Sequence, residues 1–172
     1  MPVSSDLHLG PPARAAKVLA DLSRTPAHVA EVFEDLSHWE RIWRPGPDAW
    51  NCAEIAGHLL DAEIAFAYRL RMALAEPGKL LDAFDQDAWV STQRYSEVPV
   101  EETLATFAAL RRNLVLQVSR VTDDELGRHY IHSSRGHQTI LDLIEFLKTH
   151  DARHLVQLGK VSEHARQARP IG

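Results

Sequence analysis

Apolar residues recur at intervals of three and four positions through four long stretches of the chain, and nowhere do they alternate with polar residues as a half-buried strand requires. The stripe is clearest in residues 51–76, and similar stripes run through residues 12–36, 99–118 and 139–164. This spacing predicts an all-α protein built as a four-helix bundle. We expect an up-down arrangement with one long crossover between the second and third long helices, short accessory helices and no β-strand.

Capping residues and helix breakers mark where the predicted elements begin and end. Four segments start with a polar residue followed three positions later by an acidic one, a capping-box pattern: Ser37 and Glu40, Asn51 and Glu54, Thr122 and Glu125, Thr139 and Asp142. Thr25 followed by Pro26 is typical of an N-cap and first helical residue, so we expect a new helix to start there. A short helix is expected within residues 85–95 and a polar loop over residues 128–138.

The composition limits the classes of protein to which the chain can belong. Its 172 residues, 45% of them hydrophobic, suffice for one domain with an apolar core, and we expect residues 1–11 to form a flexible N-terminal tail. The net charge of −5 argues against a nucleic-acid partner, and no apolar run is long enough to cross a membrane. Because Cys52 is the single cysteine and the start lacks a signal-peptide pattern, we expect a cytoplasmic protein without an internal disulfide.

Histidines are numerous, ten in all, and two of them share a helix face. His150 and His154 lie four positions apart in the last predicted helix, which places their Cβ atoms about 5–6 Å apart. On a helical projection both lie in or beside the apolar stripe. Two imidazole nitrogens at this separation can bind one transition-metal ion with bonds of about 2.0–2.1 Å. Alternatively, they are interfacial residues that are hydrogen-bonded to their neighbours.

A third histidine, His58, borders the apolar stripe of the helix predicted for residues 51–76. Burying three imidazoles without partners is costly, and one shared cation would satisfy all three. Asp151 falls in the middle of the apolar stripe of the last helix, where a carboxylate needs a partner. It either orients a metal-binding imidazole or forms a structural ion pair. His129, His132 and His137 cluster in the predicted polar loop. We expect them to be solvated, with the alternative that one of them approaches the site.

Several segments resemble the DinB/YfiT-like superfamily, in particular its DinB-like branch. The similarity is carried by Trp50-Asn-Cys-Ala-Glu-Ile-Ala-Gly-His58 with its continuation to Glu63, and by His150-Asp-Ala-Arg-His154-Leu-Val-Gln157. The segment Phe84-Asp-Gln-Asp-Ala-Trp89 and the loop that starts at Trp43 are similar too. The resemblance runs from about residue 23 to residue 163, and its specific part is the set of three histidines.

This resemblance implies a single DinB-like helical bundle domain over residues 12–172. It further implies one divalent transition-metal ion, nickel or zinc, held by His58, His150 and His154. Many members of the superfamily form homodimers through their helices. Their activities include metal-dependent hydrolysis and S-transfer with low-molecular-weight thiols, so the family identifies the site better than the substrate.

Three neutral nitrogen ligands leave a fourth metal position open, as in catalytic zinc sites. A water bound there has its pKa lowered towards 7, which supports hydrolysis of a small-molecule substrate. A thiol bound there would favour its thiolate, the nucleophile in S-transfer. The candidates for orienting a metal-binding histidine or for acid–base catalysis are Asp151, Asp61 and Glu63. The candidate substrate-binding residues are Arg69, Trp89 and Arg94.

A metal-dependent hydrolase is the function we expect from these features. Two alternatives remain open from the sequence: a metal-dependent S-transferase, and a non-catalytic bundle in which the ion mainly holds the helices together. A solvent-connected cavity at the histidines would favour an enzyme, whereas a shielded site would favour the structural bundle.

Overall fold

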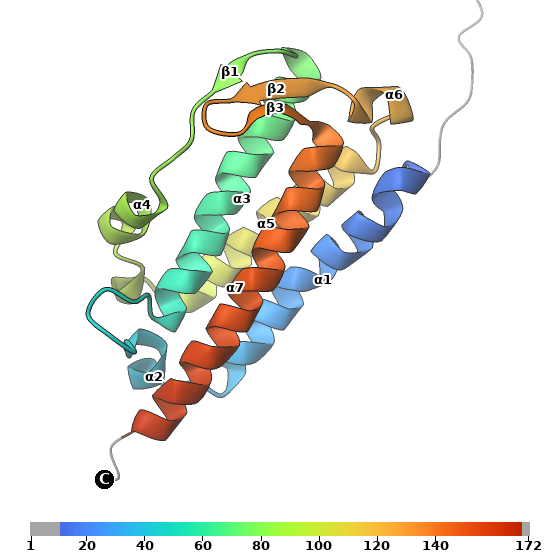
Figure 1. The fold of residues 1–172 in the computed structure, drawn as a ribbon. Coiled ribbons are helices and arrows are strands. Elements are labelled where there is room, and N and C mark those ends of the chain that lie inside the picture. Colours follow the sequence, from blue (N-terminus) through green and yellow to red (C-terminus); the bar gives the residue numbers. More distant parts are fainter. Residues whose placement is uncertain (1–10, 170–172) are drawn as a thin grey trace, which may run out of the picture.

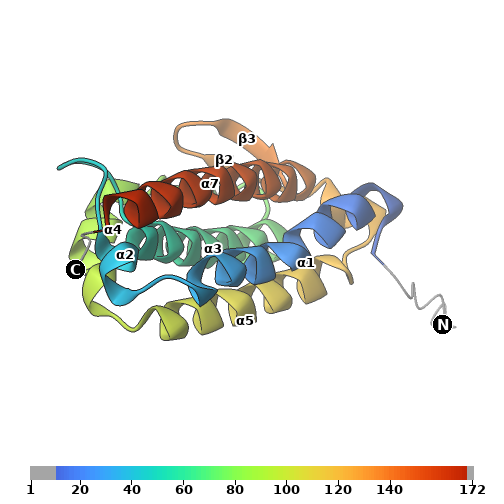
Figure 2. The ribbon, with the colours of Figure 1, turned by 90° about the horizontal axis from the view of Figure 1, so that it is seen from below.

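Four long helices form the body of the molecule in the computed structural model, which describes residues 11–169 (Figure 1). They are α1 (Ala13–Glu34), α3 (Cys52–Ala75), α5 (Val100–Val118) and α7 (Ile140–Ala168). Helices α1 and α3 each pack against both α5 and α7, so α5 and α7 lie at opposite corners of the bundle (Figure 2). The predicted four-helix bundle is confirmed. The tail predicted for residues 1–11 lies, apart from residue 11, outside the described residues.

The crossover from α3 to α5 determines the direction of the helices. It contains β1 (Leu80–Leu81), α4 (Gln86–Gln93) and the 3₁₀ helix η1 (Tyr95–Glu97), and it returns the chain to the end of the bundle where α3 begins (Figure 1). Helices α3 and α5 therefore run in the same direction, and α1 and α7 run together in the opposite one. Two further short helices, α2 (His38–Ile42) and α6 (Asp123–Leu126), complete the helices of the described residues.

All four predicted capping boxes are present. In each, the first polar side chain accepts a hydrogen bond from the backbone N–H three residues on, and the acidic side chain accepts one in return. These contacts satisfy N–H groups that have no partner within the helix, and they fix the starts of α2, α3, α6 and α7. The two helices that carry the histidines thus begin at residues recognisable from the sequence.

The expectation that the chain contains no strand is wrong. Residues 128–138, predicted as a polar loop, belong largely to β2 (His129–His132) and β3 (Gly136–Thr139), an antiparallel hairpin in which His129 faces Thr139. Strand β1 pairs with β2 in parallel, with Leu80 opposite Ile131. Strands of two to four residues are too short to show a periodic pattern, and this sheet forms because the bundle brings the crossover beside the hairpin. It covers the end of the bundle where α3 stops and α7 starts (Figure 1).

The expected break at Pro26 is also wrong, because α1 continues through it. Proline has no N–H, so the carbonyl of Leu22, four residues earlier, loses its helical partner. The guanidinium of Arg111 on α5 donates to this carbonyl instead, with 3.0 Å between Nη1 and O. A contact between helices thus compensates the defect, and local sequence gives no indication of it.

Candidate metal centre

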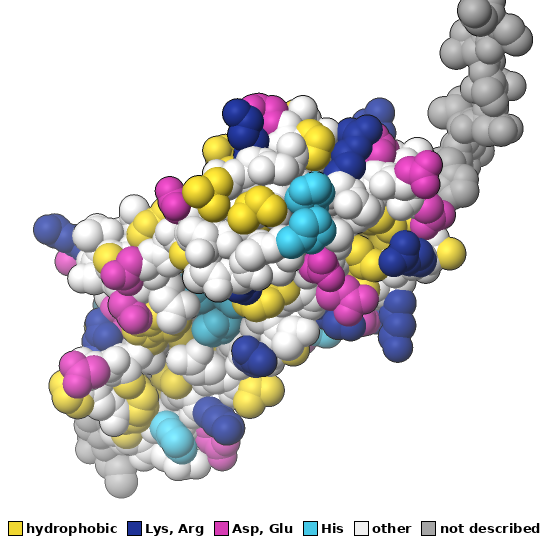
Figure 3. Space-filling model, turned by 45° about the horizontal axis from the view of Figure 1, so that its top comes forward, with side chains coloured by type: hydrophobic (Ala, Val, Ile, Leu, Met, Phe, Trp, Pro, Cys, Tyr) yellow, Lys and Arg dark blue, Asp and Glu magenta, His cyan; other side chains and the backbone are white. Residues whose placement is uncertain are grey.

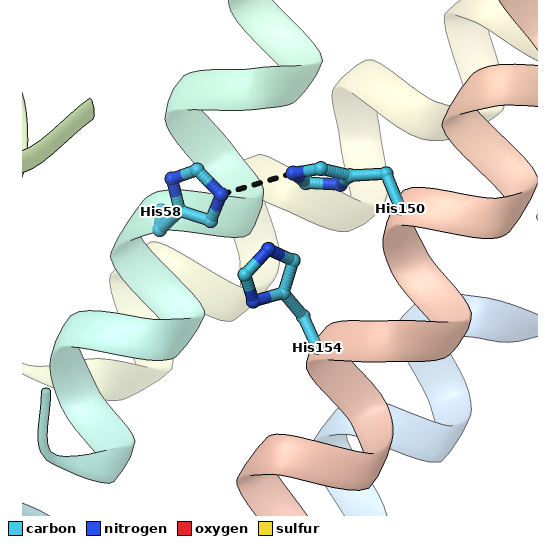
Figure 4. Close-up of side chains that lie close together, drawn as sticks. All are labelled: His58, His150 and His154. Carbon is cyan, nitrogen blue, oxygen red and sulfur yellow. Dashed lines mark hydrogen bonds between the residues drawn. The ribbon is translucent and has the colours of Figure 1, made fainter. Parts of the chain in front are cut away.

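The three histidines singled out in the sequence meet in the interior of the bundle (Figure 4). His58 comes from the first half of α3, while His150 and His154 project from successive turns of α7. The Nε2 atoms of His58 and His150 are 2.9 Å apart, and one nitrogen from each ring lies within 4.8 Å of the others. Tetrahedral ligation with bonds of about 2.0–2.1 Å places ligand nitrogens roughly 3.3 Å apart, so these separations fit a shared ion after small ring rotations.

Burial keeps two of these rings in the form that a metal requires. His58 is 1% exposed, and burial, reinforced by His154 and His150, lowers its pKa to about 3. Burial and the neighbouring His150 also lower the pKa of His154. Both rings are therefore neutral at pH 7 and keep a lone pair for a ligand bond. The Nδ1 atom of His58 is buried without a hydrogen-bond partner among the described residues, so the ring is held only through its other nitrogen and by packing.

Neighbouring side chains hold the rings in position. The Nδ1 of His154 lies 2.8 Å from the Oε1 of Gln157, so the ring donates through Nδ1 and leaves Nε2 free. The Nδ1 of His150 lies 3.5 Å from a carboxylate oxygen of Asp151. The indole of Trp50, just before α3, packs with its centroid 4.8 Å from the His58 ring. The role of Gln157 was not predicted, although its spacing of three residues from His154 on one helix is visible in the sequence.

Behind the histidines, a fully buried arginine joins two carboxylates. Arg111 donates to Glu63 through Nε and Nη2 at 2.9 and 2.7 Å, and to Asp151 through Nη1 at 2.7 Å. Burial acts to raise the pKa of Asp151. The hydrogen bond from His150 and the charge of Arg111 nevertheless keep this pKa below its usual value. Asp151 therefore makes both contacts that the sequence left open: an ion pair with Arg111 through one oxygen and a contact with His150 through the other.

The candidates for acid–base catalysis lie away from the open space around the histidines. Asp61 accepts a hydrogen bond from the Tyr95 hydroxyl at 2.7 Å, and burial raises the pKa of this carboxyl group. Glu63 is enclosed with Arg111. Among the described residues, none of the three candidates (Asp61, Glu63 and Asp151) lines either of the cavities that reach the histidines.

Two cavities meet at His150. The smaller, of about 160 Å³, reaches His58 and extends under the sheet to Arg69 and Phe84. The larger, of about 430 Å³, reaches His154 from the other side. The site is therefore accessible rather than shielded, which is the feature expected of an enzyme.

The three predicted substrate-binding residues do not lie together. Arg69 lines the smaller cavity. Trp89 does not line it but packs on Phe84, with ring centroids 4.6 Å apart. Arg94 lies in a different hollow, lined among others by Arg44 and Asp87.

The expectation of a solvated side chain is wrong for one of the loop histidines. His132 is 2% exposed and lines the smaller cavity, where the sequence favoured a solvated side chain. Arg135, in the turn between β2 and β3, lines the same cavity and was not predicted to contribute. Both positions depend on the hairpin, which the sequence pattern does not indicate. His129 and His137 stack on each other, with ring centroids 4.2 Å apart, and do not line either cavity.

Comparison with known proteins agrees with this geometry. A family model described as the DinB superfamily matches residues 21–158, which include all three histidines. This chain belongs to the DinB superfamily. The resemblance inferred from the sequence is thereby confirmed.

Relatives in the superfamily share limited sequence identity with this DinB protein. A protein of Oceanobacillus iheyensis named "putative metal-dependent hydrolase" is 25% identical over 125 residues, which cover 73% of this chain and 69% of the relative. One of Halalkalibacterium halodurans with the same descriptive name is 19% identical over 140 residues, 81% of each chain. The solved structure of YfiT from Bacillus subtilis, described as "a probable metal-dependent hydrolase with an unusual four-helix bundle topology", matches with a TM-score of 0.81 and 17% identity. That match covers 86% of this chain and 85% of YfiT. At this identity the match shows the fold alone.

None of the helices in the described part of this DinB protein is both long and apolar enough to pass through a membrane.

Proposed function

We propose that this DinB protein is a metal-dependent hydrolase of small molecules, and that His58, His150 and His154 bind one divalent transition-metal ion, zinc or nickel. The observation that carries the proposal is the convergence of three imidazole nitrogens within 4.8 Å at the meeting point of two open cavities. The names of the relatives from Oceanobacillus and Halalkalibacterium and the description of YfiT support the same class of function.

The side chains around the histidines orient the proposed ligands, and the cavities leave them open to solvent. Gln157 directs Nε2 of His154 towards the site, and Asp151 supports His150. Trp50 packs against the ring of His58. A divalent ion held by three imidazoles acts as a Lewis acid and lowers the pKa of water towards 7, which supplies a nucleophile for hydrolysis at neutral pH.

The proposal is tested with a panel of small ester and amide substrates. We expect hydrolysis by the purified protein to disappear after treatment with a chelator and to return when zinc or nickel is added. His154→Ala should not recover activity on metal addition. His164→Ala, which changes an exposed histidine of the same helix, should behave as the wild type.

Two results would contradict a hydrolase. One is turnover that is unaffected by the chelator across the panel. The other is turnover that occurs only when a low-molecular-weight thiol is supplied, with the thiol transferred to the product.

A further inference from the structure

The smaller cavity beside the histidines is lined by positively charged and hydrogen-donating side chains. At one end lie His58 and His150, and at the other lie Arg69 from α3, His132 from β2 and Arg135 from the hairpin turn. In Figure 3 a histidine and a basic side chain are partly visible between uncharged and hydrophobic surface, below the hairpin, with charged side chains close by. The position of these groups, next to the candidate metal centre, suggests a role in binding substrate.

Arg69 is a buried cation that has no acidic partner within residues 11–169. Its residue is 4% exposed, and its one hydrogen bond to the described residues goes from Nη2 to the carbonyl oxygen of Asp82 at 3.0 Å. The guanidinium lies between two aromatic rings, 5.6 Å from the centroid of Phe66 and 5.9 Å from that of Phe84. Burial of a charged group that keeps most of its N–H donors unused is expensive unless a ligand supplies the missing acceptor.

A second guanidinium reaches the same space. Arg135 lies over the ring of Phe146, 4.4 Å from its centroid, and so is held at the cavity mouth. Among residues 11–169, no carboxylate lies within ion-pair distance of Arg69 or of Arg135. Burial lowers the pKa of the Arg69 guanidinium, the nearby Tyr130 acts to raise it, and the charge of Arg135 lowers it further, which places the two cations within reach of each other.

His132 adds a neutral donor to this cationic end. Its Nδ1 accepts a hydrogen bond from the backbone N–H of Ser134 at 3.2 Å, which leaves the ring proton on Nε2. Burial, with the charges of Arg135 and Arg69, lowers the pKa of His132 to about 4, so the ring carries no charge at pH 7. Arg69, Arg135 and His132 therefore all offer donors, and this end of the cavity lacks a negatively charged side chain among its described lining residues.

We propose that this end of the cavity binds an anionic group of the substrate, a carboxylate or a phosphate, between Arg69, Arg135 and His132. Arginine binds both anions through paired N–H donors in a planar arrangement. The two cavities share Gln86, Phe146 and His150. A substrate whose anionic group is bound at this end therefore has the bond to be cleaved at the histidines, and the rest of the substrate extends into the larger cavity. The placement of the cleaved bond rests on the proposed hydrolase, whereas the anion site does not.

Binding is measured by calorimetric titration of the full-length protein after metal removal, so that an anion cannot bind to the ion itself. The probes are succinate, inorganic phosphate and the uncharged diamide of succinate. Arg135→Gln changes an exposed turn residue, and Arg69→Lys keeps the buried charge while removing the planar donor set. Arg71→Gln changes an exposed arginine of α3, the helix that carries Arg69, and is the matched control. Circular dichroism checks that each variant is folded.

We expect succinate or phosphate to bind and the diamide not to bind. Arg135→Gln and Arg69→Lys should each weaken anion binding about tenfold or more, since each removes charge-assisted hydrogen bonds, and Arg71→Gln should leave it unchanged. The preferred anion identifies which of the two groups the substrate carries. Absence of binding by both anions, or equal binding by all variants, would overturn the proposal. A protein that binds the anion through these arginines but never binds a metal would retain the anion site and refute the hydrolase.

Discussion

At the scale of single residues, different atoms of one side chain contact different partners in the site. Asp151 shows this most clearly, because one oxygen pairs with the buried Arg111 and the other contacts the Nδ1 of His150. Glu63 pairs with the same arginine but makes no hydrogen bond to a histidine among the described residues. The two carboxylates therefore share Arg111 as a partner, but only Asp151 also contacts one of the three histidines.

Asp151→Asn should weaken metal binding by about 10–100-fold, because the contact that orients His150 loses its negative charge. Glu63→Gln is the control, since it also removes one carboxylate from Arg111 but leaves His150 alone. Both changes should lower the free energy of unfolding by about 1–3 kcal/mol, because each weakens a charge-assisted hydrogen bond to Arg111 while the other carboxylate keeps its ion pair with this arginine. Competition with a chromophoric chelator measures the affinity, and equal affinities in the two variants would assign Asp151 a purely structural role.

The residues of the candidate site were predictable to the extent that they lie on long helices. The positions of His58, His150 and His154 follow from helical periodicity, because a helix fixes the direction of each side chain relative to the apolar stripe. Arg135 and His132 lie in a hairpin whose position is set by tertiary contacts, so no local pattern indicates that they reach the same cavity. Asp61 looked equivalent to Glu63 in the sequence, yet the structure pairs it with Tyr95 from the crossover.

At the scale of elements, helix α3 is shaped by close packing against the crossover. Gly57 precedes His58, and a Cβ atom added at this glycine would overlap the ring of Tyr95. The absence of a side chain therefore allows Tyr95 to approach the helix and to donate its hydroxyl hydrogen to Asp61. The starts of four helices were predictable because capping is local. The sheet and the unbroken course of α1 through Pro26 were not, because each depends on a distant partner.

Gly57→Ala should destabilise the protein by roughly 1–3 kcal/mol, since the added methyl group must displace an aromatic ring in a packed interior. Gly159→Ala is a matched control on α7, where an added Cβ meets no neighbouring atom within 4 Å. That change should instead stabilise the protein by up to about 1 kcal/mol, the usual gain from replacing a helical glycine. Urea unfolding measures both values, and equal stability of the two variants would refute the close approach of Tyr95.

At the scale of the whole molecule, the bundle brings polar side chains from distant parts of the chain together around one cavity. Helices α3 and α7 supply the histidines, and the crossover and the hairpin, paired through β1 and β2, cover the cavity beside them. The sequence predicts the bundle and the approach of α3 to α7, because amphipathic helices must bury their apolar faces. It does not predict the cavity, whose walls come from short segments that adopt their structure only against the completed bundle.

The central claim is that the three histidines bind one metal ion, and elemental analysis of the purified protein tests it most directly. The wild type and His164→Ala should each contain close to one equivalent of zinc or nickel after incubation with the metal and removal of the excess. His58→Ala and His154→Ala should each retain far less, because two imidazoles bind a divalent ion much more weakly than three. A wild-type protein that takes up no metal, or full occupancy in both of these variants, would contradict the claim.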